Sequence, residues 1–237
     1  MITDVEDNSD IPERLISGQF TRFTIGIDID DAYLFDVRVK DNLSIVEGQL
    51  WATTIVDDKE KIGIIGINGT GKSTFLKVLV GAVEADEGVI SRNPNVQVSF
   101  LSQNPAMEDD ATVLEQVFLH FPAEFRQLNE YEAKSMLSKL GITDFEQKVG
   151  TLSGGQRKRV ALVAALVHPA DILILDEPTN HLDLVSKEVL ENALNSYTGT
   201  ILYVSHDRYF INRTASRILS LTDQVLLNYP GNNSTEV

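Results

Sequence analysis

The feature that most constrains the fold of this chain is a glycine-rich loop at residues 66–73. It reads Gly-Ile-Asn-Gly-Thr-Gly-Lys-Ser and fits the pattern G-x-x-x-x-G-K-[ST] at every position. An apolar run at residues 61–65 precedes the loop, and a helical pattern follows from Lys72 until Gly81 ends it. This context of strand, loop and helix indicates a phosphate-binding loop and argues against a glycine-rich turn that matches by chance.

The chemistry of such a loop follows from its backbone. Glycines let the N–H groups turn inward around an anion, and the N-terminus of the following helix adds partial positive charge. We expect Lys72 to reach the β- and γ-phosphates of a nucleotide and the Ser73 hydroxyl to coordinate Mg²⁺. The predicted nucleotide-binding residues are Gly66, Asn68, Gly69, Thr70, Gly71, Lys72, Ser73 and Thr74.

Two acidic residues follow a second apolar run. Residues 172–175 read Ile-Leu-Ile-Leu, which leaves no solvent face and is typical of a central parallel strand covered on both sides. Asp176 and Glu177 would then lie at the edge where α/β sheets bind ligands. We expect Asp176 on the Mg²⁺ side and Glu177 as the general base that activates water. Solvated acids at a strand end are the alternative, which the neighbouring motifs do not favour.

A third motif lies between these two, at residues 151–156, and reads Thr-Leu-Ser-Gly-Gly-Gln. Gly154 and Gly155 allow close backbone approach, Ser153 offers a hydroxyl, and a helix beginning at Gln156 would point its N-terminus forward. Together these residues predict a second anion site. The three basic residues that follow, Arg157, Lys158 and Arg159, suit a solvated face or local ion pairs better than a nucleic-acid patch.

The three motifs in this order resemble the ATP-binding cassette (ABC) ATPases. The resemblance implies that the segment from Ser153 to Gln156 closes over ATP held by another cassette, so that a single cassette is half of an active enzyme. It also implies two further site residues. His206 matches the switch histidine that contacts the γ-phosphate, and Gln103 matches the Q-loop glutamine that senses the metal and the lytic water.

Residues 176–183 (Asp-Glu-Pro-Thr-Asn-His-Leu-Asp) and residues 205–210 (Ser-His-Asp-Arg-Tyr-Phe) further resemble the ABC-F subfamily, whose members are soluble ATPases that act on ribosomes. Residues 228–232 also resemble the end of an ABC-F cassette. ABC-F proteins normally carry two cassettes and a long helical linker, and this sequence contains neither the linker nor a second cassette. We therefore expect pairing with a second cassette, either another copy or another chain, and contact with the ribosome.

Two local departures from the family pattern concern the adenine side of the site. The position where an aromatic ring usually stacks on adenine falls near Leu43, and Tyr33, Phe35 and Trp51 lie nearby but out of register. Lys59 also replaces the glycine usually found before the strand that leads into the phosphate loop. Both departures leave nucleotide selectivity open.

The predicted fold is α/β: a P-loop NTPase core with a mostly parallel sheet, an N-terminal antiparallel β subdomain and an inserted helical signature subdomain. Strands are expected at residues 25–29, 33–39 and 50–56, and helices at residues 112–121 and 124–140. The expected organisation is a disordered tail at 1–12, one ATP-binding cassette at 13–232 with the helical subdomain at about 104–168, and a tail at 233–237. An arm insertion in the helical part is not expected.

Composition narrows the class of protein. With 237 residues and 43% hydrophobic content, the chain can bury one sizeable core. No apolar run approaches the roughly 18 residues of a membrane span, and the acidic start is unlike a signal peptide. The absence of cysteine excludes disulfides and thiolate metal sites and suits a cytoplasmic location.

A net charge of −15 argues against extensive direct nucleic-acid contact, because phosphate contacts depend on Lys and Arg. Three functions stay open. The first is an ABC-F type ATPase in ribosome-associated translation control; the second is the nucleotide-binding subunit of an ABC transporter; the third is a nucleotide-binding module with little hydrolysis. Asn180 and His181 favour the first over the second, because transporter cassettes more often carry a small residue and Ala there.

Overall fold

The computed structural model describes residues 32–41, 48–57, 59–84, 87–91, 95–222 and 225–230, and it describes no side chains for β1, β4 and most of β2. The expected strand at 25–29, the adenine-side position at Leu43 and both expected tails lie outside these residues. Within them, strands and helices are interspersed from residue 61 onward, as in α/β proteins.

In the described part of the chain, nine strands form one sheet in the order β4-β1-β2-β9-β8-β3-β7-β6-β5. Strands β5, β6, β7, β3 and β8 pair in parallel, whereas β1 pairs antiparallel with β2 and β4, and β8 pairs antiparallel with β9. The predicted combination of a mostly parallel core and an N-terminal antiparallel part is confirmed. The strands are β1 (Ala32–Asp41), β2 (Gly48–Asp57), β3 (Lys61–Gly66), β4 (Glu87–Ser91), β5 (Val98–Leu101), β6 (Ile172–Asp176), β7 (Thr200–Val204), β8 (Arg217–Thr222) and β9 (Val225–Pro230).

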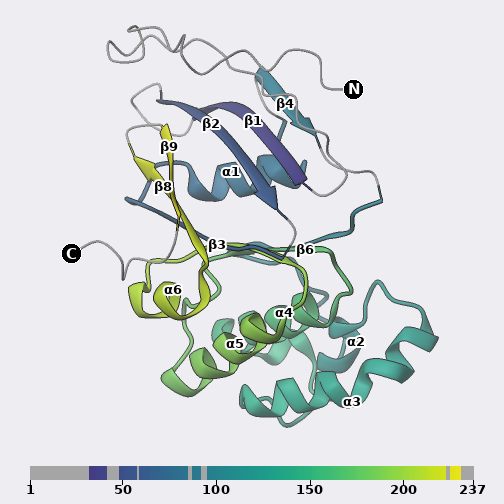
Figure 1. The fold of residues 1–237 in the computed structure, drawn as a ribbon. Coiled ribbons are helices and arrows are strands. Elements are labelled where there is room, and N and C mark those ends of the chain that lie inside the picture. Colours follow the sequence, from purple (N-terminus) through teal and green to yellow (C-terminus); the bar gives the residue numbers. More distant parts are fainter. Residues whose placement is uncertain are drawn as a thin grey trace, which may run out of the picture.

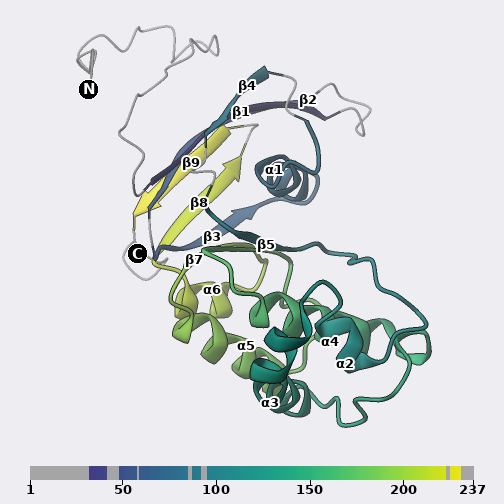
Figure 2. The same cartoon turned by 90° about the vertical axis from the view of Figure 1, so that its right-hand side faces the viewer.

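The sheet curves around one helix and carries the others on its opposite face (Figures 1 and 2). Helix α1 lies inside the curve, and α2 to α6 cover the other side. Helices α2, α3 and α4 are inserted between β5 and β6, as the sequence predicts. The helices are α1 (Lys72–Leu79), α2 (Val113–Val117), α3 (Ala123–Lys139), α4 (Gly154–Val167), α5 (Leu184–Ser196) and α6 (Arg208–Thr214), with a short 3-10 turn η3 (Val149–Thr151).

Strand β6 shows why its sequence is apolar throughout. Ile172 and Ile174 face the cluster that packs around α1, whereas Leu173 and Leu175 face the cluster beneath α4 and α5. Because a strand points successive side chains to opposite faces, a strand covered on both sides needs apolar residues at every position. The buried β6 positions its carboxyl end, and the acids that follow it, at the edge of the sheet.

Candidate nucleotide site

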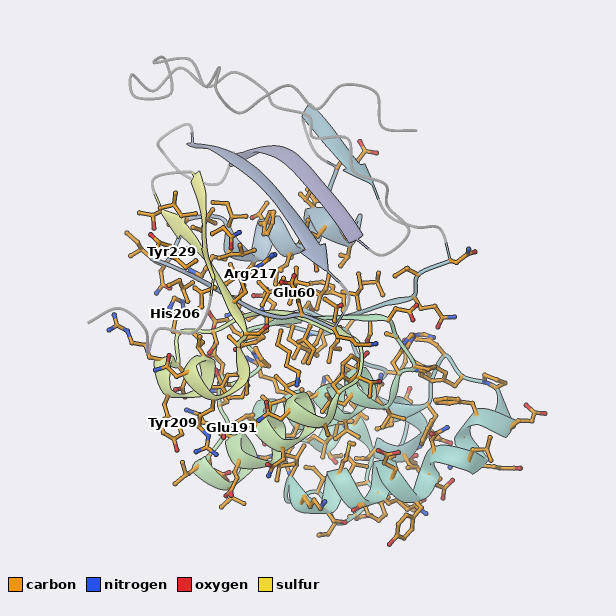
Figure 3. All side chains as sticks on the ribbon, in the orientation of Figure 1. Glu60, Glu191, His206, Tyr209, Arg217 and Tyr229 are labelled. Atoms are coloured by element: carbon orange, nitrogen blue, oxygen red, sulfur yellow. The ribbon has the colours of Figure 1, made fainter. Side chains whose placement is uncertain are left out.

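Adjacent strands bring the predicted site residues to one edge of the sheet. The parallel strands β3, β7, β6 and β5 are neighbours in that order. Strand β3 leads into the phosphate loop and β7 into His206, while β6 ends at Asp176, directly before Glu177, and β5 leads into Gln103. Because parallel strands end at the same edge, four segments far apart in the sequence meet there. Figure 3 labels His206 on this edge of the sheet, on the same side of the molecule as Tyr209 of α6.

The phosphate loop has the backbone that an anion cradle requires. Gly69 and Gly71 adopt left-handed φ angles of 84° and 89°, which side chains rarely allow. Gly66 has a different constraint, since a Cβ there would lie 2.4 Å from the Leu221 carbonyl oxygen. Asn68 and Gly69 are exposed, and Thr70 closes the turn by donating its hydroxyl to the Ile67 carbonyl at 2.9 Å. Thr74 is half-buried in the first turn of α1.

The Lys72 ammonium group lies inside this loop. Its side chain is buried, and Nζ donates to the carbonyl oxygens of Gly66 and Ile67, both at 2.8 Å. Burial lowers the pKa of Lys72, while the charges of Glu177 and Asp176 partly offset that shift. A lysine has three donors, so one N–H remains for an incoming oxygen.

Asp176 lies beside the first turn of α1. The Ser73 hydroxyl donates to Asp176 Oδ1 at 3.0 Å, and Asp176 Oδ2 is buried with no hydrogen-bond partner among the described residues. Burial raises the pKa of Asp176, against the lowering effects of the Ser73 hydrogen bond, the Lys77 charge and the Gln103 backbone N–H. A hydroxyl beside an unpartnered buried carboxylate oxygen is a donor set that suits Mg²⁺, which takes few protein ligands.

A converging cluster of three or more His, Asp and Glu side chains is absent from the described part of the chain. The single carboxylate of Asp176 beside the Ser73 hydroxyl fits Mg²⁺, because that ion is commonly held by one or two carboxylates together with substrate phosphates. The residues present therefore fit a magnesium-bound nucleotide.

Glu177 is held in a strained backbone conformation. Its φ angle is 53°, which a non-glycine residue rarely adopts, and its N–H donates to the Val204 carbonyl at 3.0 Å. The carboxylate is buried, with Oε1 3.0 Å from His206 Nε2 and Oε2 without a partner among the described residues. Burial raises the pKa of Glu177, and Asp176 adds to the rise, whereas His206 and Lys72 oppose it.

A cleft opens directly beside these acids. Gln103 is exposed at its rim, and Lys158 from the first turns of α4 contributes a cation. The cleft therefore joins the segment after β5 to the end of β6. Its lining residues are Leu101, Ser102, Gln103, Pro105, Lys158, Leu162, Asp176, Glu177, Pro178, Asn180 and Leu182.

The Ser153–Gln156 segment is built differently from the prediction. Helix α4 begins at Gly154, two residues before the expected start at Gln156. Ser153 is the N-cap: its hydroxyl accepts from the Gln156 N–H at 3.3 Å, and the Gln156 side chain accepts from the Ser153 N–H at 2.9 Å. The S-x-x-Q spacing is a capping-box signature that sequence reasoning overlooked.

The structure does not bring this segment onto the phosphate loop. Helix α4 packs on the face of the sheet opposite to α1 (Figure 2). Ser153 and Gly154 are exposed and Gly155 and Gln156 half-buried, so the segment presents a helix N-terminus outward. The basic run that follows is partly paired, since Arg157 and Asp109 form an ion pair at 2.5 Å.

Comparison with known proteins agrees with this geometry. The family model described as ABC transporter matches residues 52–180. The chain belongs to the ABC transporter family. Its resemblance to ABC-F proteins is confirmed by curated relatives that carry that name.

Three relatives illustrate the similarity. The chain is 42% identical over 214 residues to the uncharacterized ABC transporter ATP-binding protein YfmR of Bacillus subtilis, covering 75% of the chain and 34% of the relative. It is 39% identical to ABC transporter F family member 5 of Arabidopsis thaliana, and the match covers 93% of the chain and 30% of the relative. It is 33% identical to the energy-dependent translational throttle protein EttA of Haemophilus influenzae, and the match covers 74% of the chain and 38% of the relative. The chain thus spans about a third of the length of these relatives.

A solved structure shows the same fold. The complex of archaeal ribosomal stalk protein aP1 and the ribosome recycling factor aABCE1 contains a chain that superimposes with a TM-score of 0.67 at 31% identity, covering 85% of this chain and 39% of that one. No helix in the described part of the present chain is long and apolar enough to cross a membrane.

Proposed function

We propose that this chain is an ATP-hydrolysing cassette of the ABC-F type that works with a second cassette in ribosome-associated translation control. The observation that carries the proposal is the Glu177 and His206 pair, 3.0 Å apart, beside the Ser73 and Asp176 contact, also at 3.0 Å. In this proposal Glu177 is the base, and Ser73 and Asp176 belong to the metal ligand set beside the phosphate loop. This is the combination that water attack on a nucleoside triphosphate requires.

Each residue has a role in the proposed reaction. Lys72 and the loop N–H groups would bind the phosphates, while Ser73, Asp176 and Gln103 would hold Mg²⁺. When bound, Mg²⁺ neutralises developing charge on the phosphate oxygens. Glu177 orients the attacking water and accepts its proton, and its raised pKa improves its fitness as a base near neutral pH. His206 holds the Glu177 carboxylate in place and would contact the γ-phosphate of a bound nucleotide.

The second half of the site would come from another cassette. Ser153, Gly154, Gly155 and Gln156 present a capped helix N-terminus on the far face of the sheet, where they suit the phosphates of a nucleotide bound elsewhere. Under this proposal two cassettes, from this chain or another, sandwich two nucleotides and separate after hydrolysis.

The translation role and a cytoplasmic setting rest on the named relatives. One is called a translational throttle protein, and a structural neighbour is called a ribosome recycling factor. Because the chain has a net charge of −15, we expect weak and salt-sensitive contact with ribosomal particles.

The pairing is tested with Glu177→Gln, which blocks hydrolysis while nucleotide binding persists. With saturating ATP, we expect light scattering to detect a dimer that the nucleotide-free chain does not form. Adding Ser153→Arg should abolish the dimer while calorimetry still detects ATP binding. Ser153→Ala is the control, because it removes the cap of α4, at about 1 kcal/mol, without blocking the surface. A Glu177→Gln chain that stays monomeric at high concentration would exclude self-pairing.

The biological role is tested by expressing Glu177→Gln in cells and fractionating the lysate on a low-salt gradient. Co-migration with ribosomal particles that added salt disrupts would support the proposal. Recovery in the membrane pellet would favour a transporter subunit instead. An ATPase rate per chain that does not rise with protein concentration would favour a binding module with little hydrolysis.

A further inference from the structure

The loop that carries His206 is anchored on both sides of that residue. On the N-terminal side, the Ser205 hydroxyl lies 2.9 Å from the Thr179 hydroxyl, and both side chains are buried. Ser205 Oγ also accepts the Asp207 N–H at 3.1 Å. Thr179 follows Glu177 by two residues, so this contact ties the His206 loop to the segment after β6.

On the C-terminal side, the two carboxylate oxygens of Asp207 accept hydrogen bonds from different groups. Oδ1 accepts the Phe210 N–H at 3.1 Å and caps α6. Oδ2 accepts from Lys187 Nζ at 2.6 Å, in an ion pair whose side chains are 30% and 22% exposed. Lys187 lies in the first turns of α5, so the pair joins α5 to the residue next to His206.

Helices α5 and α6 meet again further along. Arg213 Nε lies 2.7 Å from Glu191 Oε2, and Arg213 donates to the Tyr209 hydroxyl at 2.9 Å. Glu191 on α5 and Tyr209 on α6 lie close together in Figure 3. This second contact joins the two helices again, four residues beyond Lys187 along α5.

We propose that Lys187 is a positioning residue of the site, because through Asp207 it fixes the loop that holds His206 against Glu177. The inference rests on the proposed function, in which Glu177 and His206 act on the bound nucleotide. His206 is itself 48% exposed and so gains little support from packing. Its position depends on its neighbours, and a misplacement of about 1 Å can cost as much as a hundredfold in rate.

The test compares variants that separate this role from general stability. Lys187→Met removes the ammonium group and keeps the length of the side chain. Asp207→Asn leaves a single oxygen that can cap α6 or accept from Lys187, but not both. Lys187→Arg keeps the charge and should keep function. Lys134→Met is the matched control, because Lys134 makes an equally short 2.6 Å pair with Glu130 on α3, away from the site.

Kinetics give the first readout. Lys187→Met should lower kcat for ATP by about tenfold with little change in KM, since it disturbs alignment rather than binding. Asp207→Asn should also lower kcat with little change in KM. The double variant should be no slower than the slower single variant, because the two substitutions remove the same contact between Lys187 and Asp207. Lys187→Arg and Lys134→Met should stay near the unaltered rate.

The second readout needs no nucleotide. The chain has 4 histidines, so imidazole-labelled protein gives few NMR signals, and His206→Gln assigns the signal of His206. Lys187→Met should move that signal and leave the other histidine signals in place, whereas Lys134→Met should move none. If the unaltered chain does not hydrolyse ATP, the proposed function fails and the NMR result alone decides the inference. An unmoved His206 signal in a folded Lys187→Met protein overturns it.

Discussion

Replacing Glu177 by Gln should stabilise the nucleotide-free fold while it slows hydrolysis by orders of magnitude. The Glu177 side chain is only 7% exposed, and one of its oxygens is buried without a partner among the described residues. A buried charged group that lacks a full set of partners costs roughly 1–3 kcal/mol or more. Gln is nearly the same size and neutral, but its amide also needs partners. We therefore expect a net gain of about 1–2 kcal/mol, or about 2–8 °C in Tm for a chain of this size.

The pH dependence of this gain in stability follows from the direction in which the pKa of Glu177 is shifted. Burial raises the pKa of Glu177 in the folded state, so folding disfavours its charged form at neutral pH. The unaltered protein pays this cost above the folded-state pKa and is relieved of it as the pH falls through that value. The difference in Tm between Glu177→Gln and the unaltered chain should therefore be largest at neutral pH and shrink toward acid.

Thermal unfolding without nucleotide at several pH values checks this reasoning, and ATP turnover by the same samples checks the catalytic half. Turnover should fall by about 10²- to 10⁴-fold, as for loss of a general base. Glu124→Gln, on the exposed face of α3, is the control and should change neither quantity. A Glu177→Gln protein that is less stable at neutral pH would show that the His206 contact outweighs the cost of burial.

Three further predictions follow from the same geometry. Lys72→Ala should weaken ATP binding about 10- to 150-fold by calorimetry, since it removes charge-assisted contacts of about 1.5–3 kcal/mol, and unchanged affinity would contradict the phosphate-loop assignment. The acid limb of kcat/KM against pH should lie above the ordinary glutamate value of 4.5, because Glu177 must be deprotonated and burial raises its pKa; a limb at or below 4.5 would exclude Glu177 as the base. Lys59→Gly should raise the free energy of unfolding by about 0.5–1 kcal/mol, and with it the urea midpoint, since Lys59 has a φ of 61° and a left-handed residue costs about 1–2 kcal/mol, less the entropy of glycine; a lower midpoint would mean that side-chain contacts of Lys59 outweigh the strain.

The local parts of the site could be predicted from the sequence. The phosphate loop is encoded by residues adjacent in the chain, and the left-handed angles at Gly69 and Gly71 are those its glycines allow. The burial of β6 on both faces was readable from its apolar run. Gln103 and His206 carry no such local signal, and only the resemblance to a family predicted that they would join the same edge.

Other features depend on contacts between distant segments. The left-handed angle of Glu177 has no sequence signal, because it is imposed where the Glu177 N–H meets the Val204 carbonyl at 3.0 Å. The ion pair of Lys187 and Asp207 joins α5 to the N-cap residue of α6, and composition cannot select it from the other charges of the chain. The capping box of Ser153 and Gln156 differs from these features, because its S-x-x-Q spacing can be read directly from the sequence.

The structure gives the two departures on the adenine side different meanings. Tyr33, Phe35 and Trp51 belong to β1 and β2, whose side chains at these positions lie outside the described residues, so the expectation that none of them is in register to stack on adenine stays a prediction. Lys59 is different, because its φ of 61° lies in the region that glycine favours. A glycine at this position would relieve backbone strain at the turn before β3. The departure at Lys59 therefore bears on the stability of the strand that leads into the phosphate loop, and it gives no reason to expect a change in which nucleotide binds.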